Sequence, residues 1–316
     1  MSEKLRIVFM GTPDFAAGIL KDMVEKGKNI VGVITAPDRP AGRGRKLTSS
    51  AVKEYALSQN LKVLQPINLK DNTFLNELKN LNANLQVVVA FRMLPKVVWE
   101  MPKQGTFNLH ASLLPQYRGA APINWAIINQ EKTTGVTTFF IDEKIDTGHI
   151  ISNRKVSIGE NETAGSLHDK LMVVGSELVL ETLTLIEDGH ANPTPQPNPS
   201  HLLEAPKLTQ DNTRIDWKKS GAEISAFIRG LSPYPVSWSI LKNDEDELKV
   251  KIYDAIFENT EHKLKPGEIE TTKNKLKVAC SDGYVHLLEI QMPGKRKMDV
   301  SSLLNGYTFD DNAKLL

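Results

Sequence analysis

Short apolar runs alternate with amphipathic segments through the first 190 residues of the chain. Residues 85–91 form the clearest apolar run, which is typical of a strand buried on both faces of a parallel sheet. Strands separated by helices predict an α/β fold with a doubly wound, parallel-type sheet, and such sheets bind ligands beyond the carboxyl ends of their strands. The expected strands are residues 5–10, 30–35, 62–64, 85–91 and 135–141, and the expected helices are residues 15–25, 51–59, 71–80 and 165–187.

A proline-rich run interrupts this pattern at residues 191–200. It reads ANPTPQPNPS, with a proline at every second position from Pro193 to Pro199, which predicts an extended, semi-rigid connector. Short strands separated by turn residues then follow and predict a small all-β domain, as in a β-barrel. We expect a catalytic domain at residues 1–190, a linker at 191–206 and a β domain at 207–316. The expected strands of the β domain are residues 236–241, 249–257, 276–280 and 284–292.

The composition is typical of a soluble globular chain, with 40% hydrophobic and 24% charged residues. The formal net charge of +1 gives no global basic signal for nucleic acid, so any RNA contact has to come from local patches. Cys280 is the only cysteine, which excludes an intrachain disulfide and gives no sign of an oxidising compartment. Neither a signal peptide nor a membrane-spanning run is apparent. We expect a cytoplasmic monomer without membrane contact.

Three polar residues lie close to strand-like segments. Asn108 and His110 lie two residues apart after an apolar run, and Asp146 follows the strand-like residues 135–141. Residues i and i+2 of a strand point to the same face, so the amide and the imidazole should emerge side by side. An amide donor, a titratable ring and a carboxylate together make a site suited to acyl transfer between nitrogen atoms.

Each of these residues also has a simpler interpretation as a turn or core residue. Asp146-Thr147-Gly148 spells the tripeptide of aspartic proteases, but that mechanism needs two carboxylates sharing a proton and the chain has one such tripeptide. Gly11-Thr12-Pro13 follows the first strand, yet the glycine-rich dinucleotide and Walker patterns are both absent. The sequence therefore predicts neither a protease nor a nucleotide cofactor.

The segment from Phe107 to Gly148 resembles the signature of the formyltransferases that use 10-formyltetrahydrofolate. That signature contains Asn-x-His, then Ser-Leu-Leu-Pro, then an Asp-x-Gly-like turn, which correspond here to Asn108 and His110, residues 112–115, and residues 146–148. The stretches FMGTPDFA (residues 9–16) and PDRPAGRGRKL (residues 37–47) narrow the resemblance to members that act on methionyl-tRNA. The resemblance implies a Rossmann-like catalytic domain and a C-terminal barrel of the oligonucleotide-binding type that contacts tRNA.

The resemblance also implies where the folate co-substrate binds. The loop after residues 85–91 would line the pterin pocket, although the family commonly has Tyr-Gly where this chain has Phe91-Arg92. No metal ligands cluster in the sequence, so no metal is expected. The expected folate-binding residues are Phe91, Arg92, Met93, Leu94, Ser112, Leu113, Leu114, Pro115 and Asp142.

The basic segment at residues 35–50 has two interpretations. Four cations against Asp38 give it a local charge of 4 − 1 = +3, which suits either a solvated loop or a lid that grips RNA phosphates; the resemblance favours RNA. Residues 207–316 carry 17 basic and 17 acidic residues, so their net charge is zero, but one basic cluster lies on a turn there. The expected tRNA-binding residues are Arg39, Arg43, Arg45, Lys46, Lys295, Arg296 and Lys297.

The predicted reaction is transfer of the formyl group of 10-formyltetrahydrofolate to the amino group of methionyl initiator tRNA, as used in translation initiation. The Asn108 amide would donate a hydrogen bond to the oxyanion. His110 would donate to the same oxygen or shuttle a proton, and Asp146 would orient and charge the imidazole or relay protons. Two alternatives are a formyltransferase acting on a small amine, such as a sugar nucleotide or glycinamide ribonucleotide, and a non-enzymatic RNA-binding protein.

Overall fold

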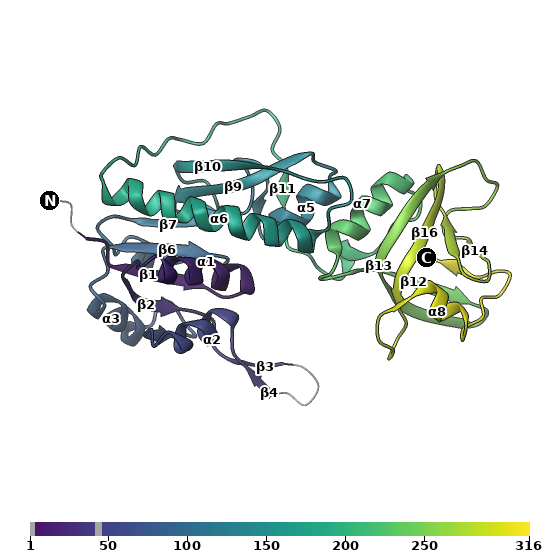
Figure 1. Ribbon diagram of the computed structural model, residues 1–316, viewed down its shortest axis with the longest axis horizontal. Coiled ribbons are helices and arrows are strands. Elements are labelled where there is room, and N and C mark those ends of the chain that lie inside the picture. The colour runs from purple at the N-terminus through teal and green to yellow at the C-terminus, as the bar shows by residue number, and fades with distance from the viewer. Residues whose placement is uncertain (1–3, 42–45) are drawn as a thin grey trace. The chain divides into compact units, whose positions relative to one another are not determined.

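The computed structural model of the protein describes residues 4–41 and 46–316 (Figure 1). These residues form two compact units, each with a hydrophobic core. The first unit comprises residues up to Gly119 with Thr134–Val156 and His168–Glu204, and the second comprises Ala120–Thr133, Ser157–Leu167 and Ala205–Leu316. None of the described helices is long and apolar enough to cross a membrane.

The first unit is built on a sheet with the strand order β10-β9-β7-β6-β1-β2-β5. The pairs among β7, β6, β1, β2 and β5 are parallel, which confirms the predicted α/β fold, whereas β9 runs antiparallel to β7. The chain adds β2 and β5 on one side of β1 and then β6 and β7 on the other, so the winding reverses between β1 and β6. The strands are β1 (Ile7–Gly11), β2 (Ile30–Ile34), β5 (Val63–Leu64), β6 (Leu85–Val89), β7 (Thr106–His110), β9 (Thr133–Phe140) and β10 (Ile150–Ser157).

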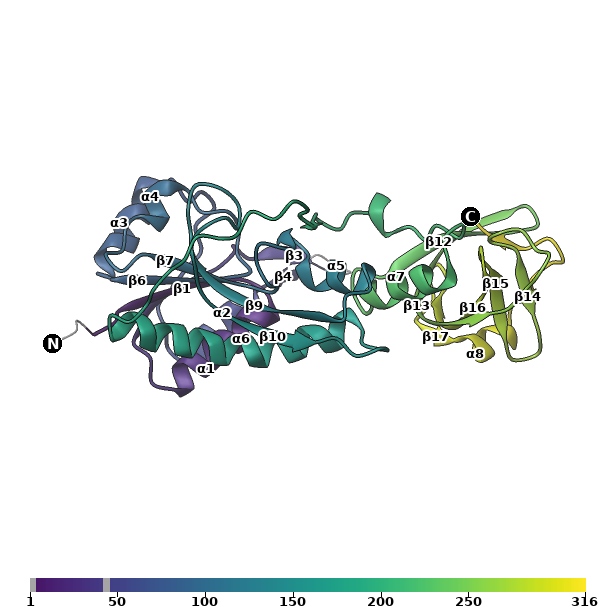
Figure 2. The ribbon, with the colours of Figure 1, turned by 90° about the horizontal axis from the view of Figure 1, so that it is seen from above.

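Helices cover both faces of this sheet, with α1 and α6 on one face and α3 and α4 on the other (Figure 2). Leu109 of β7 points towards α6, because a methyl group added to Gly175 would lie 2.9 Å from a Leu109 side-chain carbon. On the opposite face, Met10 and Val88 form a buried cluster with Phe74 of α3. The helices of this part are α1 (Asp14–Glu25), α2 (Ala51–Ser58), α3 (Asn72–Asn80), α4 (Lys96–Trp99) and α6 (Ala164–Glu187).

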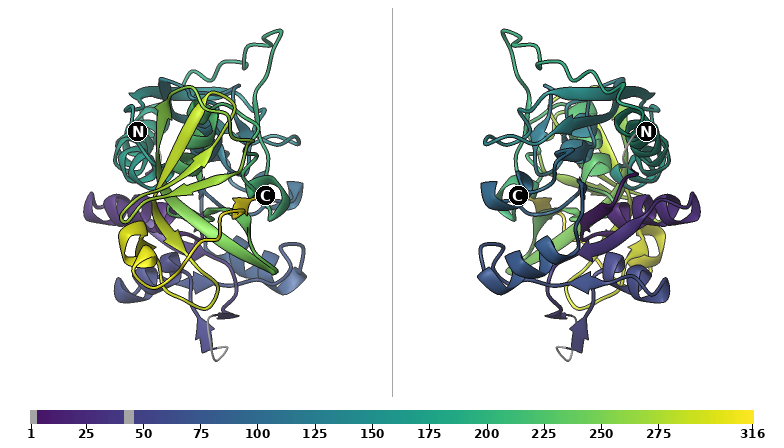
Figure 3. Two further views of the ribbon diagram at one scale, coloured as in Figure 1. Left: turned by 90° about the vertical axis from the view of Figure 1, so that its right-hand side faces the viewer. Right: turned by 90° about the vertical axis from the view of Figure 1, so that its left-hand side faces the viewer.

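The second unit contains an antiparallel, barrel-like sheet with the order β14-β15-β16-β13-β12-β18, and β17 beside β16 (Figure 3). A bridge between Glu268 and Lys314 links the region just before β14 to β18, so the sheet nearly closes, which confirms the predicted small β-barrel. Its interior is apolar and includes Trp217, Val250 and Cys280. The strands are β12 (Ser237–Asn243), β13 (Asp246–Asn259), β14 (Ile269–Thr271), β15 (Leu276–Ala279), β16 (Gly283–Gln291), β17 (Met298–Asp299) and β18 (Lys314–Leu315).

Helix α7 packs against this sheet and against α5 within the same unit. The Asn124 side chain donates to the carbonyl of Gly230 at 2.8 Å, and a methyl group on Gly230 would lie 2.6 Å from Ile128, so glycine allows this close approach. The remaining elements are α5 (Pro122–Ile128), α7 (Gly221–Leu231), α8 (Val300–Leu304), a 3₁₀ turn (Asp211–Thr213), and the short strands β3 (Arg39–Ala41), β4 (Lys46–Thr48), β8 (Arg118–Gly119) and β11 (Glu204–Ala205).

Candidate active site

Asn108 and His110 lie at the carboxyl end of β7, as the alternation of the strand predicts. Asn108 stands opposite Val88 of β6, while Phe107 and Leu109 are buried on the other face. The Asn108 side chain is half-buried and makes no hydrogen bond to any other residue that the structure describes. An amide at a strand end with free donors can serve a bound substrate.

His110 is 6% exposed, and its two ring nitrogens face different partners. Nε2 lies 2.8 Å from the carbonyl oxygen of Tyr117. Because a carbonyl only accepts, Nε2 carries the hydrogen and donates it. Nδ1 faces Asp146, with 3.8 Å between Nδ1 and Asp146 Oδ2. That separation is too long for a hydrogen bond, so a small movement is needed to bring the imidazole and the carboxylate into direct contact.

Asp146 is held in a tight turn within the first unit. Its φ of +56° is in the left-handed region, which is uncommon for a residue with a side chain. Its Oδ2 accepts from the backbone N–H of Gly119 at 2.9 Å. A methyl group on Gly148 would lie only 1.7 Å from the carbonyl oxygen of Phe140, so only glycine fits there. Tyr117, whose carbonyl meets His110, also has a positive φ, of +59°. Backbone strain of this kind clusters at functional sites.

The turn at residues 112–115 follows β7, and Thr137 of β9 holds it by hydrogen bonds. The Thr137 hydroxyl donates to the carbonyl of Ser112 at 2.7 Å and accepts from the N–H of Leu114 at 3.2 Å. Ser112 is fully buried and donates to the carbonyl of Gln116 at 2.6 Å. Leu114 and Pro115 are buried as well, and Leu113 is half-buried. Most side chains of this predicted folate-binding turn therefore support the turn itself.

The loop at residues 91–94 borders a cavity of about 680 Å³. Phe91 is half-buried and packs on the core, whereas Met93 is 67% exposed and Leu94 is buried. Arg92 donates to the carbonyl of Ile67 at 2.8 Å and also to the carbonyl of Pro66. These hydrogen bonds fasten the loop at residues 91–94 to the loop that contains residues 66 and 67. Burial lowers the pKa of the Arg92 guanidinium, and repulsion from the nearby cation at residue 39 adds to this effect.

Asp142 lies in a loop that contacts the same region. Its Oδ1 accepts from the N–H of Lys144 at 3.0 Å and from the hydroxyl of Thr147 at 2.7 Å. The neighbouring Glu143 accepts from Lys96 at the start of α4 at 2.9 Å. The predicted folate residues at 91–94 and 142 therefore belong to two loops joined by an ion pair.

The basic residues predicted to bind tRNA have different environments. Arg39 is exposed on β3, and the backbone at Lys46 belongs to β4, which pairs with β3. Arg43 and Arg45 lie outside the described residues. In the barrel, Lys295 and Arg296 are exposed, whereas Lys297 donates to Glu289 at 2.6 Å, so its charge is largely compensated.

A second basic surface of the barrel was not predicted from the sequence. Trp238 stands opposite Lys251 across the β12–β13 pair. The guanidinium of Arg214 lies 5.6 Å from the centre of the Trp238 ring, and Lys249 Nζ lies 3.8 Å from it. Arg214 Nε donates to the main-chain oxygen of Leu316 at 3.3 Å. Among the described residues, neither Lys249 nor Lys251 forms an ion pair with a carboxylate. We call Arg214, Trp238, Lys249 and Lys251 the Trp238 face. Arg214 and Trp238 are distant in sequence from each other and from the two lysines, so the sequence alone did not indicate this cluster.

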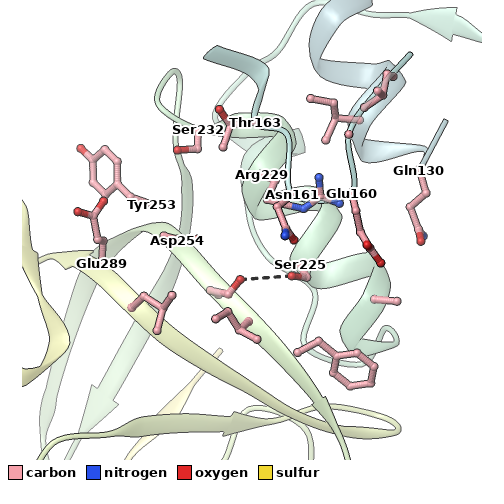
Figure 4. A pocket seen from close by; sticks show the side chains of 18 of the residues that line it. Gln130, Glu160, Asn161, Thr163, Ser225, Arg229, Ser232, Tyr253, Asp254 and Glu289 are labelled. Atoms are coloured by element: carbon pink, nitrogen blue, oxygen red, sulfur yellow. Dashed lines mark hydrogen bonds between the residues drawn. The ribbon is translucent and has the colours of Figure 1, made fainter. Parts of the chain in front are cut away.

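A second cavity, of about 770 Å³, lies within the second unit (Figure 4). Arg229 of α7 borders one side, and Tyr253 and Asp254 of β13 border the other. Burial lowers the pKa of Arg229 and raises the pKa of Asp254. None of the residues predicted to act on folate or tRNA lines this cavity, so it adds nothing to the candidate active site.

Over residues 4–41 and 46–316, no three His, Cys, Asp or Glu side chains gather as metal ligands would.

Sequence reasoning also missed one residue that contacts the site. Gln196 of the proline-rich run hydrogen-bonds both to the turn that carries Asp146 and to Arg118. No local signal distinguishes Gln196, because Asn198 is also an amide residue between two prolines.

Family comparisons agree with this fold. The chain matches the model of the formyl transferase family over residues 5–183, and the model of the formyl transferase C-terminal domain over residues 207–308. The chain therefore belongs to the formyl transferase family.

Within this family the chain falls among the methionyl-tRNA formyltransferases. It is 58% identical to the methionyl-tRNA formyltransferase of Flavobacterium johnsoniae over 313 residues, and 50% identical to that of Bacteroides thetaiotaomicron over 318 residues. Each alignment covers 99% of this chain and 99% of the relative.

Solved structures share the fold at lower sequence identity. HypX from Aquifex aeolicus in complex with tetrahydrofolic acid has a TM-score of 0.66 at 20% identity, and the match covers 98% of this chain and 49% of HypX. The sugar 3N-formyl transferase WlaRD, solved with dTDP and 5-N-formyl-THF, has a TM-score of 0.64 at 22% identity, covering 93% of this chain and 100% of WlaRD. At these identities the likeness extends to the fold alone.

Proposed function

We propose that this protein transfers the formyl group of 10-formyltetrahydrofolate to the amino group of methionyl initiator tRNA. The observation that carries the proposal is the convergence of Asn108, His110 and Asp146 at the carboxyl end of β7. The high identity to enzymes named for this reaction, over the whole chain, supports the choice of acceptor. Formylation of initiator tRNA serves translation initiation, so we also propose a cytoplasmic location.

The geometry supports one proposed role for each of the three residues. Asn108 has free amide donors, so it can donate to the oxygen that becomes negative when the methionyl amine attacks the formyl carbon. The Tyr117 carbonyl holds Nε2 of His110 in the protonated state, so Nδ1 is the nitrogen that exchanges a proton. Asp146 faces Nδ1 and stabilises the imidazolium when that nitrogen takes up a proton.

The cavity beside residues 91–94 suits a folate. Met93, Ile67 and Val97 present apolar side chains there, and Lys70 and Arg92 provide positive charge at the same cavity. A folate has an aromatic part and a part that carries carboxylates. The apolar side chains suit the first, and the cations suit the second. The co-substrate supplies the activated formyl carbon, and we propose that residues 91–94 and Asp142 hold its ring.

The tRNA would contact the exposed basic residues of each unit. In the first unit we propose Arg39, which is exposed on β3. For Arg43, Arg45 and Lys46 the support is the resemblance of the sequence alone. In the second unit these are Lys295, Arg296, and Lys249 and Lys251 of the Trp238 face, which form no ion pair with a described carboxylate. Cations near a polyanion release its counterions, which favours binding.

One assay tests the proposed function. Labelled formyl transfer from 10-formyltetrahydrofolate is measured with charged initiator tRNA and, in parallel, with an amino sugar nucleotide and glycinamide ribonucleotide as acceptors. We expect label on the methionyl amine alone. Transfer only to a small amine would replace the acceptor, and the absence of transfer to any acceptor would overturn the enzymatic assignment.

A further inference from the structure

Gln196 uses both ends of its side chain to join two loops of the active site. Its Nε2 donates to the carbonyl of Asp146 at 2.8 Å and to the carbonyl of Gly148 at 2.9 Å. Its Oε1 accepts from Arg118, at 2.6 Å from Nη2 and 3.3 Å from Nε. One amide therefore links the turn that carries Asp146 to the loop that carries Arg118 and Gly119.

The backbone around Gln196 is restricted independently of these bonds. Pro195 and Pro197 flank it, a proline ring restricts φ, and the residue before a proline is confined to extended conformations. Thr194 and Ile150 exchange two backbone hydrogen bonds, of 2.8 and 2.9 Å, which pin the run beside the start of β10. The proline-rich run thus presents the amide from a stiff segment, so little backbone freedom is lost when the bonds form.

The loops that Gln196 joins are the ones that set the geometry between His110 and Asp146. The carboxylate of Asp146 has one hydrogen bond to another described residue, from the N–H of Gly119. The imidazole of His110 meets the carbonyl of Tyr117. Both bonds come from residues 117–119, so a shift of that loop relative to the Asp146 turn would change the 3.8 Å separation between the ring and the carboxylate.

We propose that Gln196 is a positioning residue for catalysis, which holds Asp146 in register with His110. This inference rests on the proposed function. Gln196 touches no reacting atom; it acts through the backbone of residues 146–148. The proline-rich run is accordingly part of the catalytic apparatus as well as a connection towards the barrel.

The test compares Gln196→Glu with Asn198→Ala. Glutamate keeps the acceptor for Arg118 but loses the donor, and its charge repels the carbonyls of Asp146 and Gly148. Asn198 is exposed in the same run and serves as the matched control. We expect kcat of Gln196→Glu to fall by about 10- to 100-fold, as for small misplacements of catalytic groups, with KM for folate and tRNA within about threefold and Tm near wild type. Asn198→Ala should retain wild-type kcat.

A double-mutant cycle separates positioning from general support of the fold. If Gln196 acts through Asp146, adding Gln196→Glu to Asp146→Ala should lower kcat little further. Multiplicative losses, or a kcat of Gln196→Glu within twofold of wild type, would overturn the proposal. Gln196→Met replaces the amide by an apolar group of similar length; if Gln196→Glu unfolds, Gln196→Met carries the same expectations. Formyl transfer by the wild-type protein tests the proposed function separately, so the two can fail independently.

Discussion

At the scale of single residues, the site combines a short-range pattern with long-range support. Asn108 and His110 share a face because they are two residues apart on β7, which is a local property of a strand. Asp146 reaches them only through a left-handed turn, and Gly148 permits that turn because no side chain fits against the carbonyl of Phe140. The proposed chemistry thus depends on one residue pair that is placed locally and one carboxylate that is placed by packing.

Asn108→Ala tests the oxyanion role. The substitution removes the amide donors and leaves β7 intact, so we expect kcat to fall by about 10²–10³-fold, as at other oxyanion sites. Affinity for folate and tRNA should change little. Steady-state and single-turnover kinetics measure both quantities. Asn76→Ala, on the exposed side of α3, is the control. A loss confined to KM would instead assign Asn108 to substrate binding.

At the scale of elements, helix α7 shows how local sequence fixes a boundary. Ser220 accepts from the N–H of Glu223, and the carboxylate of Glu223 accepts from the N–H and hydroxyl of Ser220. This capping box satisfies donors that the first turn leaves unpaired. The same hydrogen bonds lower the pKa of Glu223.

Ser220→Ala should therefore destabilise the second unit by about 1 kcal/mol at neutral pH. Because the pKa of Glu223 is lower in the folded state than in the unfolded state, its contribution is present above the unfolded value and is lost as pH falls through the folded value. The cost of Ser220→Ala should shrink over that acidic range. Denaturant unfolding at several pH values measures it, with Ser200→Ala, in an exposed coil, as control. A cost that stays constant down to acidic pH would contradict the assigned role of Glu223.

At the scale of the whole molecule, a formal net charge of +1 hides local concentrations of positive charge. Residues 207–316 have no net charge, yet the Trp238 face gathers Arg214, Lys249 and Lys251 around one aromatic ring. Trp238 holds two of these cations in place, so they are oriented before a partner binds. Total charge therefore says little about the tRNA affinity of this protein.

Lys249→Ala should weaken binding of charged initiator tRNA and make its salt dependence shallower. If Lys249 meets one phosphate, the slope of log K against log salt should become less negative by about one unit. Filter binding or fluorescence titration over a range of salt concentrations measures the slope. Lys273→Ala, also exposed on the second unit, should leave the slope unchanged. Equal slopes for Lys249→Ala and the wild type would remove the Trp238 face from the tRNA interface.

The sequence by itself determined the α/β class, the small β domain and the pairing of Asn108 with His110. Each depends on the periodicity of residue types over a few positions. The backbone geometry of strands and helices places residues at that spacing on one face of the element. The predicted strand at residues 30–35 and helix at residues 51–59 match β2 and α2 to within one residue. The domain boundaries and the roles of the site residues stay predictions.

Only the tertiary structure decided the contacts between segments that are distant in sequence. Gln196 hydrogen-bonds to Asp146, which is 50 residues away in sequence. Arg214 and Trp238 form an isolated backbone bridge, and the guanidinium of Arg214 lies over the Trp238 ring. The sequence also did not predict the pairing of β3 with β4. Each of these strands has three residues, which is too short for a periodic signal, and β3 contains Pro40. Such contacts depend on how helices, strands and loops pack against one another. The conformational preferences of short segments do not determine that packing.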